Sequence, residues 1–207
     1  MNRENYIELR ERVGDESIDT WYQKSEPIFR SQEISSEVDF IKLVAFAYSW
    51  MPTIPEWHYE LNWRKCEKSL GKLKEGEEGA LKEVLELIVP SINNSIVGAS
   101  KVLHFAYPDA APIIDSNVVS GWRALFFPKG VRGKANGKVA ALPSNFGAYG
   151  SDAEKRSKHI DLYIKYSKNL YAWADALDGV SVRDIETKLY LLGKKITDEV
   201  KKTKKAN

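Results

Sequence analysis

Apolar side chains recur at helical spacing through most of this chain. They fall three and four residues apart between Val38 and Tyr48, and again along a longer stripe from Ile160 to Leu177. This period places them on one face of an α-helix, whereas a half-buried strand needs strict alternation, which no segment shows clearly. The sequence therefore predicts an all-α fold of several helices around a packed core.

Capping and helix-breaking residues predict several helix ends. Ser36 and Ser181 each begin a Ser-x-x-Asp segment, a pattern typical of a helix N-terminus. Glycine and proline predict C-terminal ends, because glycine is a poor helix former and proline lacks an N–H group. Three helices are expected to end in this way: one before Met51–Pro55, one over 56–70 at Gly71, and one over 77–88 before Pro90.

The length suits one domain of ordinary size. With 207 residues, of which 43% are hydrophobic, the chain can bury a substantial core without disulfides. We expect a single helical domain over 1–195, with two lobes, 1–90 and 91–195, around a cleft. The segment 196–207 is expected to be a basic tail that frays, since the chain has six lysines from Lys194 onward.

The chain has few residues for metal or redox chemistry. Its single cysteine, Cys66, cannot form an intrachain disulfide and is expected to be a small buried apolar group. The three histidines have no metal-binding spacing, so we expect no metal and no cofactor. No apolar run approaches the roughly 20 residues of a membrane span, and the first residues lack a signal pattern. We expect a cytoplasmic monomer with no membrane contact.

The charge is unevenly distributed, although the formal net charge is only +2. Residues 1–40 have ten acidic and five basic side chains, whereas 116–151 have no acidic residue. The five bases of the second window are Arg123, Lys129, Arg132, Lys134 and Lys138. Much of it is a glycine-containing irregular stretch, 128–150, and bases beside glycines suit contact with a nucleic-acid backbone. An incidental, solvated surface loop is the alternative interpretation.

The segment from Ser95 to Val118 has the most informative motif. Gly98 is expected to form a turn that opens a short apolar helix with Lys101, and Pro112 then precedes Asp115 at the start of another helix. An aspartate in that position is explained by N-capping alone. Its combination with a lysine and a basic segment raises the alternative of a catalytic pair.

The arrangement Val97-Gly98-Ala-Ser-Lys101 followed by Pro112-Ile-Ile-Asp115 resembles the helix-hairpin-helix DNA glycosylases, and most closely the branch with the 8-oxoguanine DNA glycosylase fold. The resemblance implies that Lys101 is an amine nucleophile, which would add AP-lyase activity, and that Asp115 assists departure of the base. It also implies contacts of Gly98 and Ser100 with double-stranded DNA in which one base is flipped out.

Aromatic and polar side chains near this motif are candidates for a base pocket. A flipped base is stacked between aromatic rings and bound through its edge. The candidates are Trp50, Trp57, His104 and Tyr107. For His104, on an apolar helix, a buried histidine with a satisfied hydrogen bond is the favoured alternative to a functional group.

Three functions remain open at this point. The first is an N-glycosylase that excises a damaged or modified base, in DNA repair or in defence against phages with modified DNA. The second is a DNA-binding module without catalysis, in which Asp115 only caps its helix. The third is a helical protein–protein adaptor that uses the acidic N-terminal region. For either DNA-binding function, we expect contact around residues 98–138.

Overall fold

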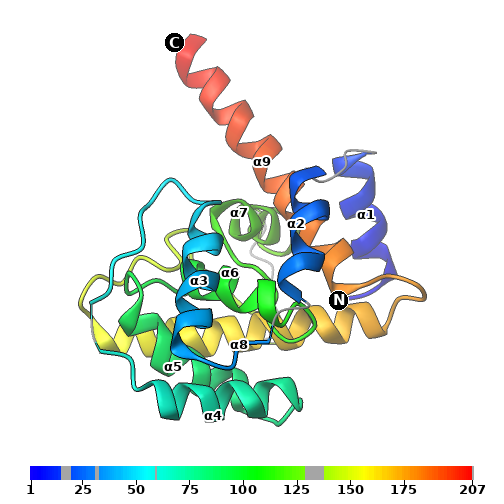
Figure 1. Ribbon diagram of the computed structural model, residues 1–207. Helices are drawn as coiled ribbons and strands as arrows, with labels where there is room; N and C mark the ends of the chain where they lie inside the picture. The colour runs from blue at the N-terminus through cyan, green and yellow to red at the C-terminus, as the bar shows by residue number, and fades with distance from the viewer. Residues whose placement is uncertain (15–19, 31–32, 59, 129–137, 207) are drawn as a thin grey trace. The chain divides into compact units, whose positions relative to one another are not determined.

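The structure, a computed structural model, describes residues 1–14, 20–30, 33–58, 60–128 and 138–206 (Figure 1). In these residues it contains nine α-helices and no strand, which confirms the all-α prediction. The helices are α1 (Arg3–Val13), α2 (Thr20–Arg30), α3 (Glu37–Tyr48), α4 (Trp63–Lys74), α5 (Ala80–Ser91), α6 (Ile96–Ala106), α7 (Ser116–Phe126), α8 (Ala153–Asp175) and α9 (Val182–Ala206).

The chain forms two compact units that are interleaved in sequence. Unit 1 comprises Met1–Ser17, Ile114–Phe146 and Lys165–Asn207, and unit 2 comprises Ile18–Ile113 and Gly147–Ile164. The first part of α8 therefore belongs to unit 2 and its second part to unit 1. The chain passes between the units several times, rather than once near residue 90.

Unit 2 has an aromatic core that joins α2, α3 and α6. Phe29 and Phe46 stack with ring centroids 3.6 Å apart. The Phe46 ring meets Phe105 edge-on at 4.8 Å, an arrangement that the ring quadrupoles favour. Because each ring comes from a different helix, this cluster fixes how α6 packs within the unit.

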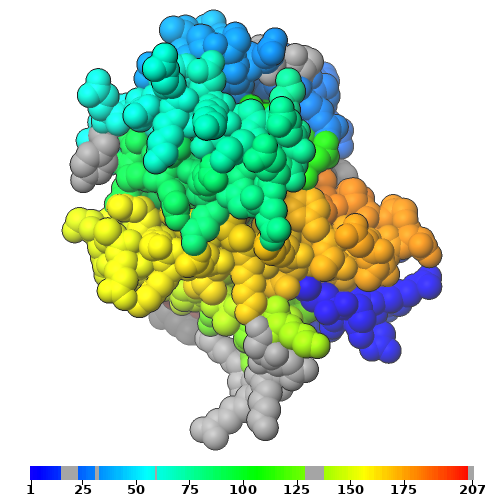
Figure 2. Space-filling view, turned by 90° about the horizontal axis from the view of Figure 1, so that it is seen from below, coloured from blue at the N-terminus to red at the C-terminus, as the bar shows by residue number. Residues whose placement is uncertain are grey.

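One face of unit 2 is formed by α4, α5 and the first part of α8. Figure 2 shows α4 and α5 in green beside the yellow residues of α8. Lys82 on α5 and Asp161 on α8 form an ion pair of 2.7 Å on this face. Both side chains are largely exposed, so the pair contributes little, and burial of residues such as Leu85 and Ile160 is the larger stabilising term.

In unit 1, two glycines bring the backbones of α7 and α9 into close contact. A Cβ atom at Gly121 of α7 would lie 2.0 Å from the carbonyl oxygen of Leu189. A Cβ atom at Gly193 of α9 would lie 1.8 Å from the carbonyl oxygen of Asn117. Position 117 of α7 faces 193 of α9, and the later position 121 faces the earlier position 189, so the two helices are antiparallel. Neither glycine can be replaced without moving a helix backbone.

Two N-caps predicted from sequence are confirmed. Ser36 caps α3, where its side chain accepts the N–H of Asp39. At the start of α9 the capping is reciprocal: Ser181 Oγ accepts the N–H of Asp184, whose carboxylate accepts the N–H of Ser181. Such paired bonds satisfy donors that a helix N-terminus otherwise leaves open.

Two predicted boundaries around α4 are wrong. The helix begins at Trp63 rather than at 56, because Asn62 caps it by accepting the N–H of Lys65. The residues before it follow an irregular path in which Trp57 pairs with Ile92. Gly71 does not end the helix, which runs to Lys74.

The predicted end of α5 is also wrong, since the helix includes Pro90 and ends at Ser91. A proline in the last turn removes only one N–H donor. The turn keeps other bonds, from Ser91 Oγ to the Leu87 carbonyl at 3.0 Å and from Ile92 N to the Ile88 carbonyl at 3.0 Å. At the other end of the chain, α9 continues to Ala206, through the residues expected to fray.

We predict that Gly193→Ala lowers the free energy of unfolding by about 1–3 kcal/mol or more, because the methyl group would overlap the backbone of α7. Gly71→Ala is the matched control, since nothing lies within 4 Å of a Cβ at that position. It should raise stability by about 0.5–1 kcal/mol through helix propensity. Urea unfolding of both variants measures the difference. Equal stability of the two variants would contradict the close α7–α9 contact.

Candidate functional site

The hairpin that joins α5 to α6 turns without glycine. Its left-handed residues are Asn93 and Asn94, with φ of 51° and 45°. Asparagine tolerates this conformation better than most residues do. Gly98, which we expected to form the turn, lies inside α6 instead. Helices α5 and α6 are thus joined by a tight turn, but this turn precedes the predicted one.

Both asparagines fasten the hairpin to neighbouring parts of unit 2. The side chain of Asn93 accepts the N–H of Glu56 at 2.9 Å and donates to the carbonyl of Ile54 at 3.1 Å. The side chain of Asn94 accepts from Arg156 Nη1 at 3.0 Å and donates to the carbonyl of Gly150. The turn is therefore held on two sides, and its asparagine side chains are engaged within the protein.

The first amides of α6 also have partners. The N–H of Ile96 donates to the hydroxyl of Tyr149 at 2.7 Å, and the N–H of Gly98 donates to Ser95 Oγ at 3.1 Å. Burial raises the pKa of Tyr149, so this phenol stays neutral and can accept the bond. A phosphate at this helix N-terminus would have to displace both partners.

Gly98 and Ser100, two predicted DNA contacts, are buried in unit 2. Gly98 allows the Tyr48 ring to approach α6, because a Cβ there would lie 2.2 Å from the tyrosine hydroxyl. Ser100 is fully buried and its hydroxyl donates to the carbonyl of Val97 at 2.9 Å. The structure thus gives both residues a role in helix packing and geometry.

A histidine supports the last part of the basic window 116–151. His159 on α8 is 5% exposed, and its Nδ1 accepts the N–H of Gly147 at 3.1 Å. Gly147 has a positive φ of 85°, and a Cβ atom there would lie 3.2 Å from Val97 Cγ2 of α6. Burial, and then Lys155, lower the pKa of His159, because both disfavour its charged form. A neutral imidazole is the form that can accept this bond.

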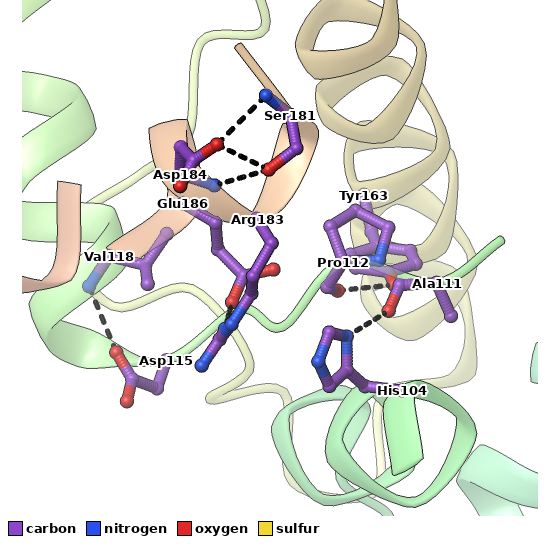
Figure 3. Close-up of polar contacts among 10 residues, drawn as sticks. All are labelled: His104, Ala111, Pro112, Asp115, Val118, Tyr163, Ser181, Arg183, Asp184 and Glu186. Carbon is purple, nitrogen blue, oxygen red and sulfur yellow. Dashed lines mark hydrogen bonds and ion pairs between the residues drawn. The ribbon is translucent and has the colours of Figure 1, made fainter. Parts of the chain in front are cut away.

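The predicted catalytic pair is divided between the two units. Lys101 is half-buried on α6 in unit 2. Asp115 is half-buried in unit 1, as the N-cap of α7, and its Oδ1 accepts the N–H groups of Asn117 and Val118, each at 2.9 Å. Figure 3 shows the bond with Val118. The N-cap prediction is confirmed, while the pairing of Lys101 with Asp115 stays a prediction.

The basic segment is described only in part. Lys129, Arg132 and Lys134 lie outside the described residues. Lys138 has an exposed side chain. Arg123 of α7 is half-buried and donates from Nη1 to the carbonyl of Leu142 at 2.7 Å. That bond uses part of its guanidinium to hold the segment that we expected to contact DNA.

The described end of this segment is firmly anchored in unit 1. Asn169 of α8 donates to the carbonyl of Lys138 at 3.0 Å and accepts the N–H of Ala140 at 2.8 Å. The buried Trp122 of α7 donates to the carbonyl of Ala140, also at 2.8 Å. Residues 138–142 are therefore held against α7 and α8 by these hydrogen bonds.

The predicted base-pocket residues differ in exposure. Trp50 is half-buried with its ring 6.0 Å from Phe105, and Trp57 is 41% exposed. His104 is 1% exposed, and its Nδ1 lies 2.9 Å from the carbonyl of Ala111, so Nδ1 is the donor (Figure 3). This burial agrees with the alternative of a satisfied core histidine.

Tyr107, the fourth of these residues, ends α6. Burial raises the pKa of its phenol to about 12, so the hydroxyl keeps its proton at neutral pH and can donate a hydrogen bond. Its neighbour in unit 2, Cys66, is fully buried as expected, with a thiol pKa of about 12 for the same reason.

Sequence reasoning missed a buried ion pair on α9. Arg183 pairs with Glu186, which is 2% exposed (Figure 3). A buried carboxylate needs such a partner, because an isolated charge is strongly destabilised in the interior. The sequence signal is a glutamate between two buried positions, Ile185 and Leu189, with an arginine three residues earlier.

No family model, curated protein or solved structure matches this chain. Within the described residues, no group of three or more histidine, cysteine, aspartate or glutamate side chains could hold a metal ion. The helices of the same ranges include none that is both long and apolar enough to cross a membrane. The resemblance to the DNA glycosylases stays a prediction.

We predict that Asp115→Ala lowers stability by about 1 kcal/mol, because α7 loses the acceptor for two N–H groups. Asp115→Asn keeps an oxygen in the same place and should remain close to the parent. Thermal or urea unfolding compares the two variants. If both are equally destabilised, the negative charge rather than the cap matters for folding.

We predict that unit 2 loses stability as the pH falls from 7 to 5. The pKa of His159 is lowered in the folded protein, so the unfolded chain binds a proton more readily around its ordinary value of 6.5. The contribution is present above that pH and is lost below it. His159→Gln should have a smaller loss of stability over this range, whereas His58→Gln, at a 42% exposed side chain, should match the parent. Unfolding midpoints at both pH values test this.

Proposed function

We propose that this protein is a DNA N-glycosylase that excises a damaged or modified base. The observation that carries the proposal is the order of three features along helices α5, α6 and α7. A tight turn joins α5 to α6, Lys101 lies on α6, and Asp115 follows at the N-terminus of α7. This is the order that the resemblance to the helix-hairpin-helix glycosylases implies.

The position of Asp115 suits the chemistry of base excision. Breaking an N-glycosidic bond leaves electron deficiency on the sugar, and a fixed carboxylate stabilises that charge as it develops. Two backbone N–H groups hold Oδ1 of Asp115 in place at the end of a helix. The helix dipole favours a negative charge at this end of α7.

Lys101 would act as the nucleophile in this proposal. It stands half-buried on α6 between residues that are fully or largely buried, such as Val102 and Phe105. A neutral amine attacks the anomeric carbon, the bond to the base breaks, and the base leaves with that electron pair and takes up a proton. The new bond between nitrogen and sugar is the intermediate expected of an enzyme with AP-lyase activity.

A DNA-binding module without catalysis is the second candidate, and one observation favours it. Asp115 already has a complete structural role as the cap of α7. In that case the same helices would hold duplex DNA, with no base released. A steep salt dependence of binding without any abasic product would identify this function.

The decisive experiment detects free bases by mass spectrometry. The protein is incubated with duplexes that contain oxidised or deaminated bases and with DNA from phages that modify their bases. We expect release of one class of base, and a rate at least about 10²-fold lower for Asp115→Asn, which keeps the cap but removes the charge. The class of base released separates a repair substrate from a phage-defence substrate.

Lys101 is tested by borohydride trapping, which converts an imine between enzyme and sugar into a stable adduct. Lys101→Gln should form no adduct, whereas Lys68→Gln, at an exposed position on α4, should form as much as the parent. Base release that is unchanged in both Asp115→Asn and Lys101→Gln would refute the catalytic assignment. Release without any adduct would refute only the role of Lys101.

A further inference from the structure

The last turns of α9 extend beyond the packed part of unit 1. Residues 191–193 are buried, whereas 198–204 are all exposed. Lys195 still binds α1, because its Nζ donates to the carbonyl of Val13 at 2.6 Å. Figure 1 shows the end of α9 extending past α1 and α7, the helices of its own unit. We call residues 194–204 the α9 arm.

The α9 arm has a net positive charge. Its eleven residues include five lysines, one aspartate and one glutamate, so five minus two gives a net charge of +3. Alternating steps of four and three residues separate Tyr190, Lys194, Thr197, Lys201 and Lys204. The three lysines of this series are exposed. That spacing places all five on one helical face. Tyr190, 37% exposed, lies at the start of this face.

The three lysines of this face have no ion-pair partner among the residues that the structure describes. Some lysines elsewhere on the surface do have such partners, as Lys72 has with Glu83 and Lys158 with Glu154. No described ion pair neutralises these three lysines, and the arm keeps a net positive charge. A polyanion that neutralises it releases counterions, which makes association favourable and dependent on salt.

The rest of the arm favours DNA over a membrane surface. A helix that lies in a membrane interface needs a broad apolar face with large residues such as tryptophan, phenylalanine and leucine. The apolar residues of the arm are Ile196 and Val200, and Val200 is 50% exposed. An α-helix also fits the major groove of B-DNA, and the arm is about 15 Å long, a length over which a duplex presents about nine charges.

We propose that the α9 arm binds the phosphate backbone of duplex DNA through Lys194, Lys201 and Lys204. This inference rests on the proposed function, because that function supplies the polyanion. It adds a DNA contact outside residues 98–138 and outside the hairpin, whose asparagine side chains are engaged within the protein, as is the N–H of Gly98. Contacts with phosphates hold a protein on DNA without reading the sequence, so the arm increases affinity rather than selectivity.

The test measures binding of a fluorescent, unmodified duplex at a series of salt concentrations. The triple variant Lys194→Gln, Lys201→Gln, Lys204→Gln should bind about tenfold or more weakly, and its plot of log affinity against log salt should be shallower by about 2–3 units. The matched control is Lys65→Gln, Lys68→Gln, Lys74→Gln, three exposed lysines of α4 with the same change of charge. It should change the slope little. Circular dichroism checks that both variants stay helical.

Each outcome decides the proposal. Equal weakening by the two triple variants would show a general effect of net charge, and no weakening by either would show that the arm does not touch DNA. Loss of binding to phosphatidylserine vesicles with unchanged DNA binding would assign the arm to a membrane surface. All three results overturn the proposal.

The failure of this inference is distinguishable from failure of the proposed function. The α9 variant should still release bases in single turnovers at saturating protein, whereas Asp115→Asn should not. If the arm binds DNA in a salt-dependent way and no base is released, the glycosylase proposal is refuted and the proposal for the arm stands. If bases are released and the α9 variant binds DNA as tightly as the parent, the proposal for the arm is refuted and the glycosylase proposal stands.

Discussion

The backbone contact between α7 and α9 is the constraint on which unit 1 depends. Gly121 and Gly193 each let a helix approach the carbonyl groups of the other, where any side chain would collide. This fixes the N-terminal end of α7, and with it the carboxylate of Asp115. It also fixes where α9 leaves the core, since Gly193 directly precedes the α9 arm. One packing requirement therefore determines the position of both the proposed catalytic carboxylate and the proposed DNA contact of this unit.

Unit 2 depends on a different kind of constraint, a network of polar contacts around a turn. Asn93 and Asn94 take the left-handed conformation and use their amides to hold the chain on both sides of the hairpin. A turn made of glycines would leave its backbone open to a ligand, whereas this turn binds to its own protein. That difference moves the expected role of the hairpin from phosphate binding toward positioning α6, the helix of Lys101.

The features that the sequence predicts correctly are local. Helical spacing, the caps at Ser36, Asp115 and Ser181, and the burial of Cys66 depend on a few neighbouring residues. The error at Gly98 involves a distant residue, because this glycine lies inside α6 where the Tyr48 ring packs against it. At Gly71 nothing lies within 4 Å of a Cβ atom, and α4 runs on to Lys74. The same holds for the candidate site. The N-cap at Asp115 is predictable from neighbouring residues, whereas the pairing of Lys101 with Asp115 depends on how the two units are arranged.

The interleaving of the units has a consequence for how the chain is synthesised and folded. Unit 1 needs α1 from the beginning of the chain and α9 from near its end, so it cannot close until most residues have been made. Unit 2 is also completed late in synthesis, because its segment 147–164 follows a long stretch of unit 1. Contacts so distant in sequence slow folding and leave apolar helix faces exposed in the nascent chain. No single cut in the chain yields either unit as one continuous fragment.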